Sequence, residues 1–162
     1  MDCGCAKTQR RKLGKQTAIH EQVLNTKSTD ELMDLYDDWA ARYDQDVNDT
    51  WGYSGPERTL FWLRHYLAPE CARVLDAGCG TGLVAVALSK GGFRRIDGID
   101  YSTAMLAEAA KKDVYQQLQQ MNMNTALPID AGAYDGVTCV GAFTSAHVVP
   151  EALHELVRVK RL

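Results

Sequence analysis

The stretch that decides the fold is DAGCGTG at residues 76–82. A short apolar strand beginning at Arg73 precedes it, and a helical pattern from about Leu83 to Lys90 follows it. Its glycines stand at alternate positions, Gly78, Gly80 and Gly82. Glycines in such a place allow a tight turn and let a ligand approach bare backbone. The stretch therefore predicts a ligand site between a strand and a helix.

Strands and helices alternate from this stretch to the end of the chain. Three more strands are expected, at Arg95–Ile99, around Gln120–Met123 and at Tyr134–Val140. Ser102 caps the helix after the second strand, and Pro150 opens a last helix. Such alternation predicts a single α/β domain with a parallel sheet, helices on both faces and ligand binding at the carboxyl ends of the strands.

Two helices are expected before the first strand. Ser28 and Glu31 form a capping box, after which apolar and aromatic residues recur at helical spacing as far as Tyr43. Residues 44–55 are rich in Asp, Asn and Gly, which predicts a loop, and Pro56 opens the second helix. Residues 1–27 are polar and basic, which predicts a mobile arm ahead of a domain at 28–162.

Composition excludes several classes of function. The net charge of -3 gives no reason to expect a nucleic-acid surface, which needs clustered Lys and Arg. No run approaches the roughly 20 apolar residues of a membrane span, and no signal peptide is recognised, so the cytoplasm or the nucleus is expected. The five cysteines lack the spacing of a disulfide framework or a metal site, so no metal is expected.

Two ligand classes fit a glycine-rich turn of this kind. The dinucleotide fingerprint G-x-G-x-x-G requires a third glycine where Leu83 stands, which argues against a nicotinamide cofactor. Asp100, about 20 residues beyond the turn, suits a bidentate contact to ribose hydroxyls. The alternative role for Asp100 is an acid at a helix N-terminus.

The turn and Asp100 together resemble motif I and the ribose-binding acid of class I S-adenosylmethionine (SAM)-dependent methyltransferases. The helix YDDWAARYD at residues 36–44, the Trp51–Tyr53 loop and the run Val140–Thr144 make the chain most similar to the Williams-Beuren-region methyltransferase-like proteins. The resemblance spans residues 28–162 and implies a Rossmann-like sheet of order 3-2-1-4 and SAM as the cofactor.

The resemblance also implies which residues touch the cofactor. They are Tyr43, Asp76, Gly78, Gly80, Gly82, Asp100, Tyr101, Met105, Asn122 and Val140. Tyr43 would meet the methionine end, and either Asn122 or Asn124 would bond the adenine amino group. For Tyr36 and Trp39, a place in the apolar stripe of the helix explains their positions as well as a cofactor contact does.

The methyl acceptor would meet the loop after the fourth strand. Methyl transfer can consist largely of positioning, so no base is compulsory. His147 is the obvious proton acceptor in that loop, and it is either catalytic or an ordinary polar residue. The loop lacks the Asn/Asp-Pro-Pro-aromatic pattern of many enzymes that methylate nitrogens in nucleic acids, so a small molecule or a protein is the expected acceptor.

The chain departs from its family after the last helix. Members of the family continue with a fifth strand beside the fourth and an antiparallel hairpin, so the sequence predicts a truncated domain whose fourth strand is an open edge. An open apolar edge favours pairing with another strand, including that of a second copy. The first hypothesis is a methyltransferase, inactive or active in this form, and the alternative is a non-catalytic SAM-binding or protein-interaction module.

Overall fold

The computed structural model describes residues 22–161 apart from 24, 27, 52 and 144–147. Most of the expected basic arm lies outside the described residues. No helix among the residues described is both long and apolar enough to cross a membrane.

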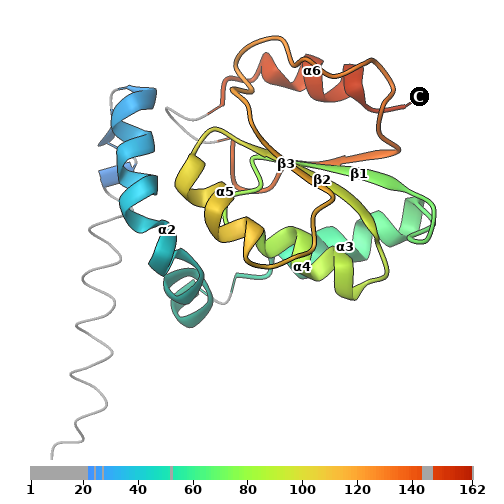
Figure 1. The fold of residues 1–162 in the computed structure, drawn as a ribbon, viewed down its shortest axis with the longest axis horizontal. Helices are drawn as coiled ribbons and strands as arrows, with labels where there is room; N and C mark the ends of the chain where they lie inside the picture. The colour runs from blue at the N-terminus through green and yellow to red at the C-terminus, as the bar shows by residue number, and fades with distance from the viewer. Residues whose placement is uncertain (1–21, 24, 27, 52, 144–147, 162) are drawn as a thin grey trace, which may run out of the picture.

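A parallel sheet of four strands in the order β3-β2-β1-β4 forms the centre of the domain (Figure 1). The strands are β1 (Arg73–Ala77), β2 (Arg95–Asp100), β3 (Gln117–Gln120) and β4 (Gly136–Thr138). Val74 of β1 pairs with Ile96 of β2 on one side and with Gly136 of β4 on the other. The predicted α/β fold class and strand order are confirmed.

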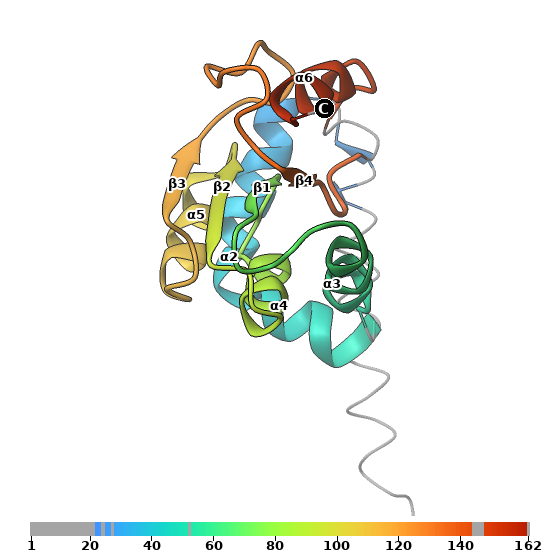
Figure 2. The same cartoon turned by 90° about the vertical axis from the view of Figure 1, so that its right-hand side faces the viewer.

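Helices cover both faces of this sheet. Figure 2 shows α6 (Ala152–Val159) on one side and both α3 (Gly55–Tyr66) and α4 (Leu83–Lys90) on the other. The apolar residues pack in two clusters, one on each face of the sheet. Phe93 and Leu88 are fully buried on the α3–α4 face, and Leu156 and Val159 of α6 are buried on the opposite face. Each such side chain stabilises the fold by about 1.5–3 kcal/mol.

The long N-terminal helix α2 (Thr29–Trp51) lies beside α5 (Thr103–Ala110), as Figure 1 shows. Its expected cap is present, since the Glu31 amide donates to Ser28 Oγ at 3.2 Å. The prediction of a loop from residue 44 is wrong, because the helix continues to Trp51. Val47 is 1% exposed and extends the buried stripe of Leu32, so tertiary packing overrides the local preference of Asp and Asn for turns.

The third strand was predicted at the wrong residues. The expected strand was Gln120–Met123, whereas β3 ends at Gln120 and residues 121–124 form the loop beyond it. Three of the four residues of β3 are exposed glutamines, and they carry no apolar alternation that could fix the position of the strand. The fourth strand is also shorter than the expected Tyr134–Val140.

Candidate functional site

The glycine-rich turn adopts the left-handed backbone conformation that its sequence predicts. Gly78, Gly80 and Gly82 have φ angles of 68°, 53° and 90°. A Cβ atom on Gly78 would lie 2.9 Å from the Cβ of Ala142. Only glycine avoids both that clash and the strained φ, so the turn lies close beneath the loop that follows β4.

Asp100 at the end of β2 is held by two backbone amides. The Gly80 amide donates to its Oδ2 at 2.8 Å, and the Ser102 amide donates to its Oδ1 at 2.9 Å. Burial raises the pKa of the Asp100 carboxyl, and these hydrogen bonds oppose the rise. Each oxygen keeps further acceptor capacity, so the carboxylate can accept hydrogen bonds from a pair of hydroxyls.

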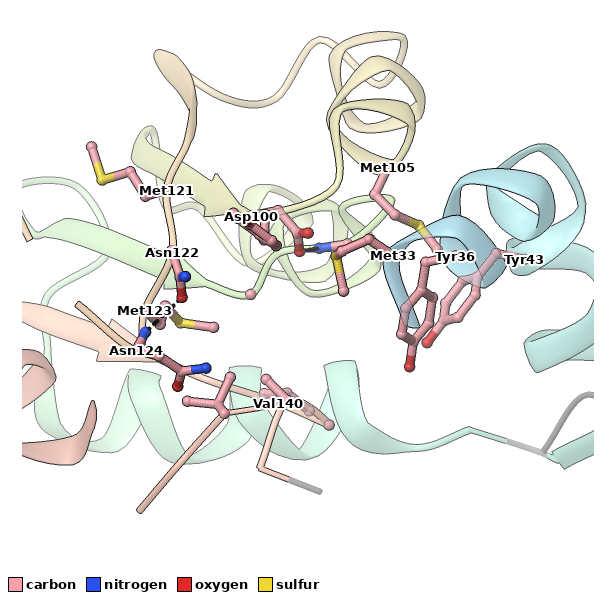
Figure 3. A pocket seen from close by; sticks show the side chains of 16 residues that line it. Met33, Tyr36, Tyr43, Asp100, Met105, Met121, Asn122, Met123, Asn124 and Val140 are labelled. Atoms are coloured by element: carbon pink, nitrogen blue, oxygen red, sulfur yellow. Dashed lines mark hydrogen bonds between the residues drawn. The ribbon is translucent and has the colours of Figure 1, made fainter. Parts of the chain in front are cut away.

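A pocket opens above the turn at the carboxyl ends of the strands (Figure 3). Its wall consists of Met33, Tyr36, Tyr43, Gly78, Gly80, Asp100, Tyr101, Met105, Met121, Asn122, Met123, Asn124, Val140, Gly141, Ala142 and Val148. Most of this wall is apolar, and Asp100 is its one carboxylate among the residues described. A ligand that fits must therefore combine apolar surface with hydroxyl donors.

Two tyrosines of α2 form one side of the pocket. Tyr36 and Tyr43 lie side by side with their ring centroids 6.5 Å apart, and Figure 3 shows them across the pocket from Asn122 and Asn124. Burial raises the pKa of Tyr43 to about 12 and raises the pKa of Tyr36 further, so both hydroxyls stay protonated at neutral pH. They can donate hydrogen bonds to a ligand.

The two asparagines opposite are oriented by backbone amides. The Asn124 amide donates to Asn122 Oδ1 at 2.9 Å, and the Val149 amide donates to Asn124 Oδ1 at 2.9 Å. The second bond joins this loop to the segment after β4. The side-chain amides carry both donors and acceptors, and the contact of Asn122 or Asn124 with the adenine amino group stays a prediction.

The structure brings eight of the ten predicted contact residues to the pocket wall. They are Tyr43, Gly78, Gly80, Asp100, Tyr101, Met105, Asn122 and Val140. Asp76 and Gly82 lie elsewhere. Gly82 caps α4, and Asp76 is 1% exposed beneath the turn. His147 lies outside the described residues.

Asp76 supports the turn from below. It accepts hydrogen bonds from Thr138 Oγ1 at 2.8 Å and from the Tyr115 hydroxyl at 2.9 Å. Desolvation raises the pKa of this carboxyl to about 6, and the two hydrogen bonds limit the rise. Asp76 therefore ties β1 to β4 and to the segment before β3, and its role here is structural.

Sequence reasoning missed the methionines of the wall. Met33, Met105, Met121 and Met123 all line the pocket, and of these only Met105 was predicted. Met121 and Met123 flank Asn122, so placing the strand end at Gln120 would have brought both to the carboxyl edge of the sheet. The sequence around Met33 gave no sign of a ligand contact, because an apolar residue at this position of α2 is explained by the helical periodicity alone.

The fold and this site define a class I methyltransferase domain. Residues 74–161, more than half of the chain, match the family model described as a methyltransferase domain, and the chain belongs to that family. The cofactor of this family is S-adenosylmethionine. The residues present fit that group, because the pocket pairs one amide-held carboxylate for ribose hydroxyls with an apolar wall for a thioether chain.

Individual relatives agree with this assignment. Human methyltransferase-like protein 27 is 39% identical over 125 residues, which cover 75% of this chain and 51% of that protein. EEF1A lysine methyltransferase 2 of Danio rerio is 32% identical over 107 residues, or 57% of this chain and 46% of that protein. The chain thus spans about half the length of these curated relatives.

Among solved structures, one similar chain is the methyltransferase in the complex with the Haloferax volcanii Trm112 methyltransferase activator. It superposes with a TM-score of 0.64 at 26% identity, covering 78% of this chain and 55% of that chain. A methyltransferase from Methanococcus maripaludis shares the fold, with a TM-score of 0.60.

Proposed function

We propose that this chain binds S-adenosylmethionine in the pocket above residues 78–80 and transfers its methyl group to a small molecule or a protein. The single observation that carries the proposal is Asp100, which two backbone amides hold at the carboxyl edge of the sheet. A carboxylate fixed in this way makes strong charge-assisted hydrogen bonds to two neighbouring hydroxyls.

The remaining wall residues set the orientation of the bound cofactor. Tyr101 and Met105 lie beside Asp100 and would cover the ribose and the adenine, whose polar edge would meet Asn122. Tyr43 and Tyr36 would then face the methionine end from α2. The backbone of Gly78 and Gly80 would contact the middle of the cofactor directly, because these residues have no side chain that would keep it away.

When bound, the cofactor supplies an electrophilic methyl group on a sulfonium. The protein must hold that methyl group in line with an acceptor atom and keep water away. The apolar residues Val140, Ala142 and Val148 line the pocket from the segment after β4. An acceptor that enters there would therefore contact apolar surface that excludes water. None of these residues moves a proton, so an acceptor that is already deprotonated suits the site best. His147 stays a proposed proton acceptor for other substrates.

The identity of the acceptor is a proposal at the level of its class. The relatives that the chain matches include a lysine methyltransferase of EEF1A and an rRNA guanine methyltransferase, so the family uses more than one acceptor class. The net charge of -3 favours a small molecule or a protein over a nucleic acid for this chain.

A second function is favoured by the exposed aromatic side chains beside β4. Trp62 and Tyr66 of α3 line a groove next to this strand, with 55% and 73% of their surfaces exposed. Exposed apolar surface of this kind can bind a partner protein. The chain would then act as a binding module, and concentration-dependent dimerisation in sedimentation would support pairing of two copies.

The test of the main proposal is calorimetric titration with S-adenosylhomocysteine (SAH). The chain is expected to bind SAH, and Asp100→Ala is expected to abolish measurable binding while the protein stays folded. Asp38→Asn, an exposed acid on α2, is the matched control and should bind as the wild type does. A folded wild-type chain without affinity for SAH would refute the proposal.

A further inference from the structure

The position of α2 decides whether its tyrosines face the pocket. Each of the two α2 tyrosines in the pocket wall is followed by an aspartate, giving the pairs Tyr36-Asp37 and Tyr43-Asp44. The pairs are seven residues apart, which is about two helical turns, so both aspartates lie on the same side of α2. Contacts that fix the position of these aspartates therefore also fix the position of the two tyrosines.

Both aspartates bind to the elements that form the cofactor site. Ser102 Oγ donates to Asp37 Oδ1 at 2.5 Å, and Thr81 Oγ1 donates to Asp44 Oδ1 at 2.5 Å. The second oxygen of Asp44 forms an ion pair with Lys112, which follows α5. The side chains of Lys112 and Asp44 are 20% and 35% exposed, so the pair is partly shielded from water.

These contacts end beside the groups that hold Asp100. The Ser102 amide is one of its two donors, and Thr81 follows Gly80, whose amide is the other. Moving α2 away would break bonds to Thr81 and Ser102, on either side of Asp100. The geometry therefore couples closure of α2 to the orientation of the ribose-binding carboxylate.

We propose that Asp44 is a positioning residue that latches α2 over the cofactor pocket through Thr81 and Lys112, and so limits the rate at which the cofactor product leaves. The inference rests on the proposed function of the pocket. The chain is expected to release SAH only after this latch opens. Thr81 supplies a hydrogen bond from a neutral hydroxyl and Lys112 supplies a salt-sensitive ion pair, so replacing Lys112 removes the ion pair and leaves the hydrogen bond in place.

The experiment is stopped-flow displacement of SAH, followed by intrinsic fluorescence, with variants of the ion pair. Asp44→Asn keeps an acceptor for Thr81 and loses the charge, so the dissociation rate constant should rise about fivefold. Lys112→Gln should act in the same direction, and the double variant should release SAH no faster than Asp44→Asn, because one ion pair is lost in each. Asp38→Asn controls for the charge change and should leave the rate unaltered.

Salt gives a readout that a merely structural role would not move. Raising the ionic strength to about 1 M should speed release from the wild type more than from Asp44→Asn, because only the wild type has this ion pair to screen. Unaltered rates in Asp44→Asn and Lys112→Gln would overturn the latch and leave the binding site standing. Failure of the wild-type chain to bind SAH would overturn the latch together with the proposed function.

Discussion

Replacing Asp76 by Asn should remove a pH dependence of stability that the wild type shows. The carboxyl is fully buried, and its pKa of about 6 lies above the ordinary value of 3.8 for an aspartate. The folded state thus binds a proton that the unfolded chain has released, so the free energy of unfolding falls as pH rises between these values. The difference in pKa corresponds to about 3 kcal/mol, of which about 2 kcal/mol falls between pH 4 and pH 7.

The assay is urea denaturation at several pH values in this interval. Unfolding free energies of the wild type minus those of Asp76→Asn should decline by about 2 kcal/mol as pH rises, whatever constant offset the substitution adds. The same subtraction with Asp38→Asn, whose carboxyl is exposed, should be nearly flat. A flat difference for Asp76→Asn would mean that the carboxyl is solvated in the folded state, and the structural role assigned to it would be wrong.

Three further outcomes are expected. Gly78→Ala should lose SAH affinity in calorimetry, because its Cβ would lie 2.9 Å from that of Ala142 at a φ of 68°. Phe93→Ala should lower the unfolding free energy in urea by about 3–5 kcal/mol, since the ring is fully buried. Trp62→Ser together with Tyr66→Ser should leave the thermal midpoint nearly unchanged and weaken any self-association measured by sedimentation, because both rings are largely exposed.

The fold could be predicted because its main signals are local. The turn at residues 76–82 needs positive φ angles that glycine supplies, and Asp100 ends a largely buried strand about 20 residues later, so both could be placed from the sequence. Ser102 was likewise expected as a cap, and its Oγ accepts from the Met105 amide at 3.0 Å. Patterns of this kind depend on a few neighbouring residues.

The rest could not be predicted because distant packing decides it. Residues 44–51 are helical because Val47 is buried in the folded protein. The Asp and Asn content of this segment does not indicate that burial. The glutamines of β3 form a strand because β2 offers its edge. Asp76 lies outside the pocket wall, and its hydrogen bonds come from Thr138 and Tyr115, which are far from it in the sequence.

The four methionines of the pocket wall have a consequence for its shape. A thioether side chain is unbranched and rotates about three bonds, so it fills irregular gaps at little cost. Met33 and Met105 approach from two helices, and Met121 and Met123 approach from the loop after β3, so compliant groups line opposite sides. The wall can therefore close on ligands that differ by a single carbon atom, which is the difference between the donor and the product of methyl transfer.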